Sequence, residues 1–185
     1  MSNRSFIKQY IKKPRIVGAI LPSSPYLADK MIEDINFEQC SCIVEYGAGT
    51  GVFTENLIKN KKQDTVVIII ECNNKFYDLL RKRYMNLENV YIINDSAENI
   101  DAYLEKFNIH FVDYVISGLP FASLPKDVSK NILNKTQRIL SKEGKFITFQ
   151  YTLFKKNFIR EYFNKISIKF ELKNVPPAFV LKCSK

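Results

Sequence analysis

The sequence predicts an α/β fold with a seven-stranded, mostly parallel sheet, helices on both faces, an antiparallel last strand and an N-terminal helical segment. After about residue 40, short apolar runs rich in β-branched residues alternate with stretches of helical apolar spacing. The runs are apolar on both faces, as in a parallel sheet that helices cover on each side. The last two runs have no helix between them, which indicates an antiparallel pair at one edge.

The 185 residues suffice for one domain with a single core, and we divide them into a helical segment over 1–38 and the α/β domain over 39–185. We expect strands at 42–46, 65–71, 90–94, 111–117, 145–151, 166–172 and 178–183. Helices should join the first five strands, and the last of these helices should end at Gly144. Their apolar faces are Phe53, Leu57 and Ile58; Phe76, Leu79, Leu80 and Tyr84; and Val128, Ile132, Ile139 and Leu140.

Two further segments carry an apolar stripe between basic residues. A helix over 5–13, ended by Pro14, would align four apolar side chains beside four cations, which is typical of a helix in a membrane interface. The stripe is Phe6, Ile7, Tyr10 and Ile11, and the cations are Arg4, Lys8, Lys12 and Lys13. Membrane docking and packing as a lid over the functional site are both open for this helix. The second stripe, within 153–166, should cover the sheet.

The formal net charge of +9 is unevenly distributed along the chain. Residues 1–30 hold six cations and one acid, a net +5, and residues 151–185 hold eight cations and two acids, a net +6. The middle is left with −2. If the two basic ends meet in space, they form one positive face suited to an anionic partner.

The composition does not predict a metal centre or a membrane span. Cys40, Cys42, Cys72 and Cys183 contain no Cys-x-x-Cys pair, and His110 is the sole histidine. We expect reduced core thiols and a packed or surface histidine. The longest aliphatic run is 66–70, far short of the roughly 20 residues that cross a bilayer, and no signal-peptide pattern opens the chain. These observations favour a soluble intracellular protein, which we expect to be a monomer.

A glycine loop follows the first expected strand: Glu45-Tyr46-Gly47-Ala48-Gly49-Thr50-Gly51, with a helix beginning near Val52. Alternate glycines let the backbone turn tightly and approach a ligand closely, at a helix N-terminus whose free amides point outward. Glu71 ends the next strand 20 residues after Gly51, a spacing at which a carboxylate can accept from ribose hydroxyls. Loop and acid together predict a nucleotide-like ligand.

Two nucleotide classes do not fit this loop. A dinucleotide fold requires Gly-x-Gly-x-x-Gly, and Val52 stands where the third glycine would be. No Gly-Lys-Ser/Thr follows the loop, which excludes the Walker type of ATP or GTP site. The remaining Glu-x-Gly-x-Gly-x-Gly pattern resembles motif I of the class I S-adenosylmethionine-dependent methyltransferases. Their Rossmann-like fold agrees with the predicted one.

The resemblance continues at Asn94-Asp95-Ser96-Ala97, the segment that holds adenine, and at Ser117-Gly118-Leu119-Pro120-Phe121, where substrate and methyl group meet. It implies S-adenosylmethionine as cofactor and S-adenosylhomocysteine as product. The implied cofactor-binding residues are Ser23, Ser24, Tyr26, Glu45, Tyr46, Gly47, Ala48, Gly49, Thr50, Gly51, Glu71, Cys72, Asp95, Ser96, Ala97 and Ser117. The implied catalytic residues are Ser117, Gly118, Leu119 and Tyr151.

Two families with different methyl acceptors share these motifs. The ribosomal RNA adenine dimethyltransferases carry Asn-Leu-Pro-Tyr where this chain has Gly118-Leu119-Pro120-Phe121, so the amide that orients the adenine amine is missing, while Phe121 could still stack on a base. The bacterial phospholipid N-methyltransferases resemble nearly the whole chain. Their opening segment resembles Val17-Gly18-Ala19-Ile20-Leu21-Pro22-Ser23-Ser24, and their tail resembles Asn174-Val175-Pro176-Pro177-Ala178.

The closer resemblance implies stepwise N-methylation of phosphatidylethanolamine toward phosphatidylcholine, by attack of a neutral amine on the methyl group. It implies a phospholipid substrate and an anionic membrane surface as partners, with the protein cytoplasmic and peripheral at the inner face of the membrane. Two alternatives stay open: methylation of RNA adenine or of a soluble amine, and a cofactor-binding module that mainly binds membrane or nucleic acid.

Overall fold

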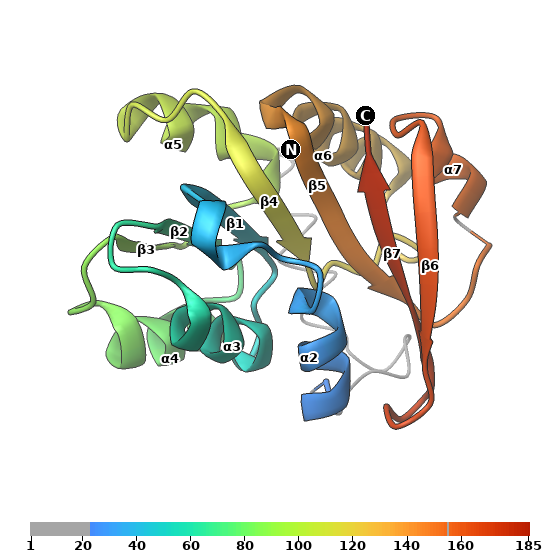
Figure 1. The fold of residues 1–185 in the computed structure, drawn as a ribbon, viewed down its shortest axis with the longest axis horizontal. Coiled ribbons are helices and arrows are strands. Elements are labelled where there is room, and N and C mark those ends of the chain that lie inside the picture. The colour runs from blue at the N-terminus through green and yellow to red at the C-terminus, as the bar shows by residue number, and fades with distance from the viewer. Residues whose placement is uncertain (1–22, 155) are drawn as a thin grey trace.

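The computed structural model describes residues 23–154 and 156–185 and is built around a seven-stranded sheet of order β3-β2-β1-β4-β5-β7-β6 (Figure 1). The strands are β1 Cys42–Tyr46, β2 Val66–Ile70, β3 Val90–Ile93, β4 Val112–Ser117, β5 Leu140–Gln150, β6 Lys165–Glu171 and β7 Ala178–Ser184. Strands β1 to β5 pair in parallel, whereas β7 lies antiparallel between β5 and β6. The predicted fold class, with its antiparallel pair at one edge, is confirmed.

Helices cover both faces of the sheet (Figure 1). They are α2 Pro25–Ile32, α3 Val52–Asn60, α4 Asn74–Tyr84, α5 Ile100–Lys106, α6 Lys126–Ile139 and α7 Lys156–Arg160, with 3-10 turns η2 Phe37–Gln39 and η3 Ala97–Asn99. One face packs against α2, α3 and α4, and the other against α5, α6 and α7. Every residue of β1 is therefore buried, which explains why the central strands read as apolar on both sides.

Helix α2 belongs to the same core as the sheet. Ser24 caps it by accepting a hydrogen bond from the Leu27 amide at 3.2 Å, and Pro25 occupies its first turn. Leu27 and Met31 are completely buried in the cluster that contains α3. The apolar stripe expected over 5–13 lies outside the described residues, so its two alternatives stay predictions.

The expected end of the helix before β5 is wrong. Helix α6 ends at Ile139 rather than Gly144, because the backbone becomes extended at Leu140 and pairs with Val112 of β4. Leu140 stays buried, which is why it continued the apolar helical pattern. Gly144 lies in an irregular part of β5, where an added Cβ would approach the Val112 carbonyl oxygen to 2.9 Å.

The segment after β5 forms less helix than its apolar spacing suggested. Helix α7 spans five residues, and the chain then joins β6, whose pairing with β7 fixes it as a strand. Ile159 and Phe163 are nevertheless buried against the sheet, where Phe163 stacks on Phe146 with ring centroids 5.3 Å apart. The predicted role of covering the sheet is confirmed.

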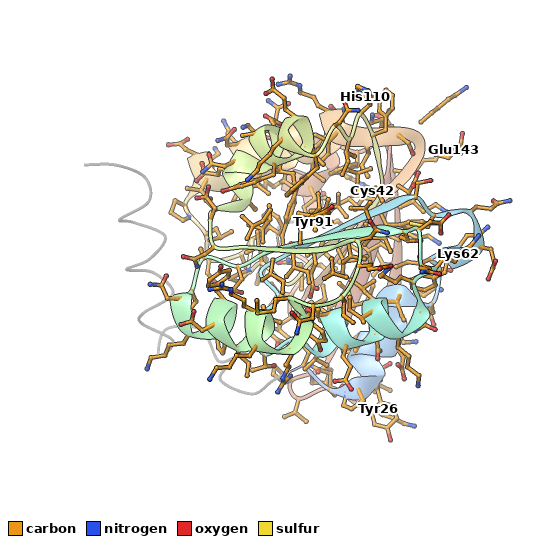
Figure 2. The ribbon with its side chains drawn as sticks, turned by 90° about the vertical axis from the view of Figure 1, so that its left-hand side faces the viewer. Tyr26, Cys42, Lys62, Tyr91, His110 and Glu143 are labelled. Carbon is orange, nitrogen blue, oxygen red and sulfur yellow. The ribbon has the colours of Figure 1, made fainter. Side chains whose placement is uncertain are left out.

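Within the two described ranges, no helix is both long and apolar enough to cross a membrane. The same residues do not gather three or more His, Cys, Asp or Glu side chains in a way that could hold a metal ion. His110 is exposed and lies at the upper edge of the molecule in Figure 2, as a surface histidine should. Cys40, Cys42 and Cys183 are buried thiols, as predicted for core cysteines.

Candidate active site

The glycine loop runs from the carboxyl end of β1 to the N-terminus of α3. Gly47, Gly49 and Gly51 have φ angles of 67°, 57° and 89°, in the left-handed region that favours glycine. A Cβ added to Gly49 would meet nothing within 4 Å, so the middle of the loop faces open space. The loop therefore has the shape that the alternate glycines predicted: a tight turn around a space that a ligand can enter.

Glu71 joins this loop to the end of β2. Its Oε2 accepts a hydrogen bond from the Gly49 amide at 2.9 Å, and its Oε1 accepts one from the Asn73 amide at 2.7 Å. A carboxylate can accept about four hydrogen bonds, so a ligand hydroxyl can still be accommodated. Burial raises the pKa of Glu71, and the backbone donors oppose that rise. This geometry suits the predicted ribose contact, which stays a prediction.

Glu45 lies beneath the loop, completely buried. Its Oε2 accepts a hydrogen bond from the Thr54 hydroxyl at 2.7 Å, whereas its Oε1 has no partner among the described residues. Burial raises the pKa of Glu45 to about 8, and the nearby charge of Glu71 acts in the same direction. A buried carboxylate oxygen without a partner is unfavourable, and a cationic ligand group would relieve that.

The segment expected to hold adenine is shaped by its own side chains. Asp95 accepts from the Ser96 amide at 2.8 Å, from Asn99 Nδ2 at 3.0 Å and from the Tyr103 hydroxyl at 2.8 Å. These bonds fix the turn from β3 into η3, and Ala97 is buried behind it. The adenine contact of Asp95, Ser96 and Ala97 stays a prediction. The sequence pattern did not identify Asn99 and Tyr103, which position Asp95.

The turn after β4 packs directly on the glycine loop. The Ser117 hydroxyl accepts from the Leu119 amide at 3.2 Å, and the Ser117 carbonyl accepts from the Thr148 hydroxyl at 3.2 Å. A Cβ on Gly118 would lie 2.6 Å from the Gly47 carbonyl oxygen, so the two turns are in backbone contact. Ser117 therefore shapes this turn, and Gly118 and Leu119 stand half-buried at its rim.

The side chains of four other predicted residues pack in or against the core. Phe121 is completely buried and packs edge-on against Phe146 at 5.9 Å, so the expectation that it could stack on a base is wrong. The side chains of Tyr46 and Ala48 are buried in the cores of the two sheet faces, and Cys72 packs against one of them. Tyr46 and Ala48 can therefore meet a ligand through their backbone atoms alone.

Asn174 brings two other predicted residues together. Its Oδ1 accepts from the Ser24 amide at 2.9 Å, and its Nδ2 donates to the Pro176 carbonyl at 2.7 Å. Its side chain also lies near the Tyr151 hydroxyl, where it opposes the rise in the pKa of Tyr151 that burial causes. The start of α2, the end of β5 and the β6–β7 turn therefore converge on one buried amide. The site prediction omitted Asn174, although a single polar residue before two prolines was the available signal.

Ser23 and Tyr26 lie beside this cluster. Ser23 is half-buried, and Tyr26 is largely exposed, with the Lys173 ammonium 4.6 Å from its ring centroid. The contact of Tyr26 is thus with the β6–β7 turn.

Thr50 of the glycine loop is held from α4. Its carbonyl accepts a hydrogen bond from the Arg83 guanidinium at 3.3 Å.

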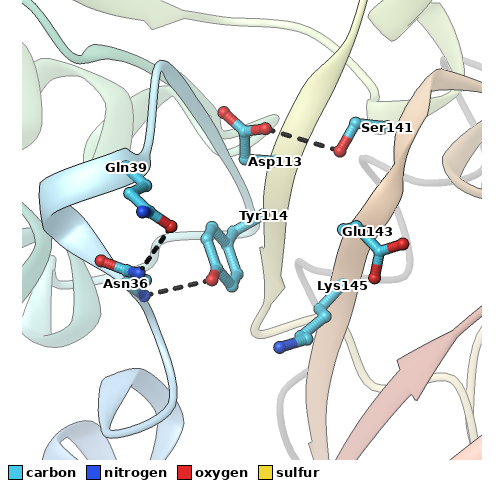
Figure 3. Close-up of a pocket in the computed structure, with 7 residues that line it drawn as sticks. All are labelled: Asn36, Gln39, Asp113, Tyr114, Ser141, Glu143 and Lys145. Atoms are coloured by element: carbon cyan, nitrogen blue, oxygen red, sulfur yellow. Dashed lines mark hydrogen bonds between the residues drawn. The ribbon is translucent and has the colours of Figure 1, made fainter.

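A hollow of about 260 Å³ lies at the opposite, amino-terminal ends of β4 and β5 (Figure 3). It is lined by Asn36, Gln39, Asp113, Tyr114, Ser141, Glu143 and Lys145. Asp113 accepts from the Ser41 and Cys42 amides at 2.8 and 3.1 Å, and so fastens the start of β1 to β4. The hollow contains none of the predicted site residues and is separate from the glycine loop.

Comparisons with known proteins agree with this arrangement. The family model for ribosomal RNA adenine dimethylase matches residues 5–171. An ornithine lipid N-methyltransferase from Singulisphaera acidiphila is 30% identical over 180 residues, which cover 96% of this chain and 93% of that protein. A ribosomal RNA small subunit methyltransferase A from Ureaplasma parvum is 29% identical over 143 residues, and this chain spans 50% of its length.

Among solved structures, the T. thermophilus 16S rRNA N2 G1207 methyltransferase in complex with AdoMet and guanosine shares the fold with a TM-score of 0.66. It is 19% identical, and the match covers 91% of this chain and 44% of that one. At this identity the likeness shows the fold alone.

Gly49→Ala should mainly weaken cofactor binding, whereas Gly118→Ala should mainly lower the free energy of unfolding. Left-handed φ at Gly49 costs a substituted residue about 1–2 kcal/mol, and the new methyl group would enter the open space of the loop. Gly118→Ala instead forces two backbones apart and should destabilise by about 2–3 kcal/mol. Urea denaturation should rank Gly118→Ala as less stable, and calorimetry should show at least about tenfold weaker S-adenosylmethionine binding by Gly49→Ala. Equal stabilities would contradict this assignment.

Glu71→Ala should weaken S-adenosylmethionine binding about 10- to 100-fold. It removes the charged acceptor of the predicted ribose hydrogen bonds, and it leaves the Gly49 amide, which fixes the loop, without its acceptor. Titration calorimetry measures the loss. Glu55→Ala, at an exposed position in the first turn of α3, is the matched control and should bind as the wild type does. Unchanged affinity of Glu71→Ala for S-adenosylmethionine would contradict the prediction that Glu71 binds the ribose.

Ionisation of Glu45 should make the chain less stable as pH rises. The pKa of Glu45 is raised from 4.5 to about 8, so between those values the folded state holds a proton that the unfolded chain has lost. The stability linked to this proton is complete below pH 4.5 and is lost as pH rises through 8. Compared with Glu45→Gln, which cannot ionise, the wild type should lose up to about 1.4 kcal/mol per pH unit in this window. Urea titrations at pH 5, 6.5 and 8 test this, and a constant difference contradicts it.

Proposed function

We propose that this chain, which belongs to the ribosomal RNA adenine dimethylase family, methylates the primary amine of a membrane lipid. Family membership makes it an S-adenosylmethionine-dependent methyltransferase. The lipid proposal is carried by the match to an ornithine lipid N-methyltransferase along nearly the full length of both chains. The ribosomal RNA relative is matched over half its length, so its substrate has weaker support here.

The residues around the glycine loop fit S-adenosylmethionine. When bound, this cofactor supplies a methyl group on a positively charged sulfur. The chain offers two buried carboxyl groups, Glu45 and Glu71, and an open space at Gly49. One oxygen of Glu45 has no partner within residues 23–154 and 156–185. Opposite charges in a poorly hydrated site attract strongly, so an ionised Glu71 favours a cationic ligand. Such a ligand in turn favours ionisation of Glu45, which holds its proton up to about pH 8 in the free protein.

The chain's contribution to the reaction is alignment of the amine and exclusion of water. The turn from Ser117 to Leu119 supplies backbone groups beside the glycine loop. Burial raises the pKa of Tyr151, so its hydroxyl stays protonated at neutral pH and orients groups by hydrogen bonding rather than acting as a base. We propose that the ammonium substrate loses its proton to water before it attacks.

Two features of the turn after β4 support a lipid amine over adenine. Gly118 stands where the RNA adenine enzymes carry an amide side chain, and the Gly47 carbonyl leaves no room for a side chain there. Phe121 is buried in the core and cannot receive a base. A primary amine at the end of a flexible headgroup requires neither contact.

Phosphatidylethanolamine and ornithine lipids both present such an amine. The sequence resemblance favours the first, and the named relative favours the second. We propose the shared chemistry, N-methylation of a primary amine held at a bilayer surface. The basic ends of the chain support a peripheral position at an anionic, cytoplasmic membrane face.

Incubation with methyl-labelled S-adenosylmethionine tests the proposal in four separate arms: vesicles with phosphatidylethanolamine, vesicles with ornithine lipid, 16S ribosomal RNA, and free ethanolamine. Label should appear in at least one lipid arm and be stronger there than in ethanolamine. Glu71→Ala should lose label in every arm, while Glu55→Ala keeps it. Label in RNA alone would overturn the lipid proposal, and label in ethanolamine alone would make the enzyme a soluble-amine methyltransferase.

A further inference from the structure

The turn between β6 and β7 has the reverse of the usual surface pattern. Leu172 is 70% exposed and Val175 71% exposed, and Pro176 and Pro177 are exposed beside them. The uncharged polar residue of the turn, Asn174, is only 2% exposed, while the charged Lys173 is exposed. Surface turns normally present polar side chains to water, and exposed apolar groups that gather at one place mark an interaction site.

The buried Asn174 amide fixes these apolar side chains in position. Its hydrogen bonds to the Ser24 amide and the Pro176 carbonyl tie the turn to the start of α2, and its side chain lies near Tyr151 at the end of β5. A turn held in this way does not fold its apolar residues back onto the core. Leu172 and Val175 therefore stay directed outward.

A tyrosine and a lysine flank the exposed apolar residues. Tyr26 is 51% exposed, and the Lys173 ammonium lies 4.6 Å from its ring centroid. The acid of this region, Glu171, is paired with Lys30 at 3.7 Å and accepts a hydrogen bond from the Lys173 amide. We define the apolar tip as Tyr26, Leu172, Lys173, Val175, Pro176 and Pro177. It lies at the lower end of the molecule in Figure 1, and Figure 2 shows Tyr26 at the lower edge.

We propose that the apolar tip inserts into the interfacial layer of an anionic lipid bilayer and anchors the protein there. Aliphatic side chains enter the acyl boundary, while tyrosine and lysine place an apolar body in that boundary and a polar end among the headgroups. The chain reaches Ser23, beside the tip, after 22 residues that hold five cations and no acid. That charge complements an anionic surface.

The composition of the tip favours lipid over nucleic acid. Single-stranded RNA is held by aromatic or guanidinium planes on which bases stack, together with many phosphate contacts. The tip contains no arginine, and the Lys173 ammonium occupies one face of its one aromatic ring, Tyr26. Leucine, valine and proline offer RNA neither stacking nor hydrogen bonds, whereas they gain from leaving water.

The topology places this anchor at the carboxyl ends of the parallel strands, where the glycine loop lies. Strand β7 is antiparallel to both β5 and β6, so β6 runs parallel to β5 and its carboxyl end lies at the same edge as the glycine loop. Asn174 then links the tip to Tyr151 on the expected substrate side. This inference rests on the proposed function, because it gives the lipid amine a route to the site without leaving the bilayer.

The test compares full-length wild type with Leu172→Ser/Val175→Ser and with a matched control, Met85→Ser/Leu87→Ser. The control pair is also exposed, at 54% and 41%, but follows α4 near the opposite edge of the sheet. Flotation with vesicles of phosphatidylglycerol and phosphatidylethanolamine measures binding, and thermal unfolding checks that each variant is folded. The tip variant should bind at least about tenfold more weakly, and the control should bind as the wild type does.

Equal binding by the tip variant and the wild type overturns the proposal, as does a wild type that binds a 16S ribosomal RNA fragment but no vesicles. Vesicle binding does not depend on methyl transfer, so the two proposals fail separately. Tip-dependent binding with no label in lipid defeats the proposed function alone. Label in lipid with tip-independent binding defeats the anchor alone.

Discussion

The Glu71 carboxylate couples the two loops on which the site depends. By accepting from the amides of Gly49 and Asn73, it fixes the middle of the glycine loop against the end of β2. The left-handed turns of the loop would otherwise leave the half-buried Gly49 amide without a protein partner, which is unfavourable. The open space at Gly49 therefore exists in the free protein before any ligand arrives. A preformed loop of this kind spares the ligand the cost of ordering it.

The same arrangement is electrostatically unfavourable in the free protein. Glu45 and Glu71 are both buried, burial raises the pKa of each, and the charge of Glu71 adds to the rise at Glu45. Glu45 Oε1 also has no hydrogen-bond partner among the described residues. A bound cation lowers both pKa values by the opposite effect, so ligand binding and ionisation of Glu45 favour each other. The core is thus less stable at the place where we propose that the positively charged cofactor binds.

The sequence predicted the features that depend on local pattern and missed those that depend on distant contacts. The runs at β1 and β2, the glycine loop and Glu71 were all visible because burial on both faces and tight turns restrict residue type locally. Ser24 and Asn174 are 150 residues apart in the sequence, so no local sequence pattern can predict their hydrogen bond. Leu140 fits a helical apolar pattern although it pairs with Val112 in the sheet. A helix and a strand at this position would bury the same side chain, so the pattern could not distinguish them.

The antiparallel edge explains how one small domain would serve both a water-soluble cofactor and, as we propose, a lipid. In a parallel sheet, ligands bind at the carboxyl ends of the strands. Here the glycine loop and the turns after β2 and β4 lie at that end of the sheet. Inserting β7 between β5 and β6 adds a short hairpin turn at that same edge, held by Asn174 rather than by a long crossover. A lipid amine cannot leave its bilayer cheaply, because its acyl chains would enter water. The proposed function therefore requires the turn that presents Leu172 and Val175 to lie beside the reacting groups, and the strand topology puts this turn at the same end of the sheet as the glycine loop.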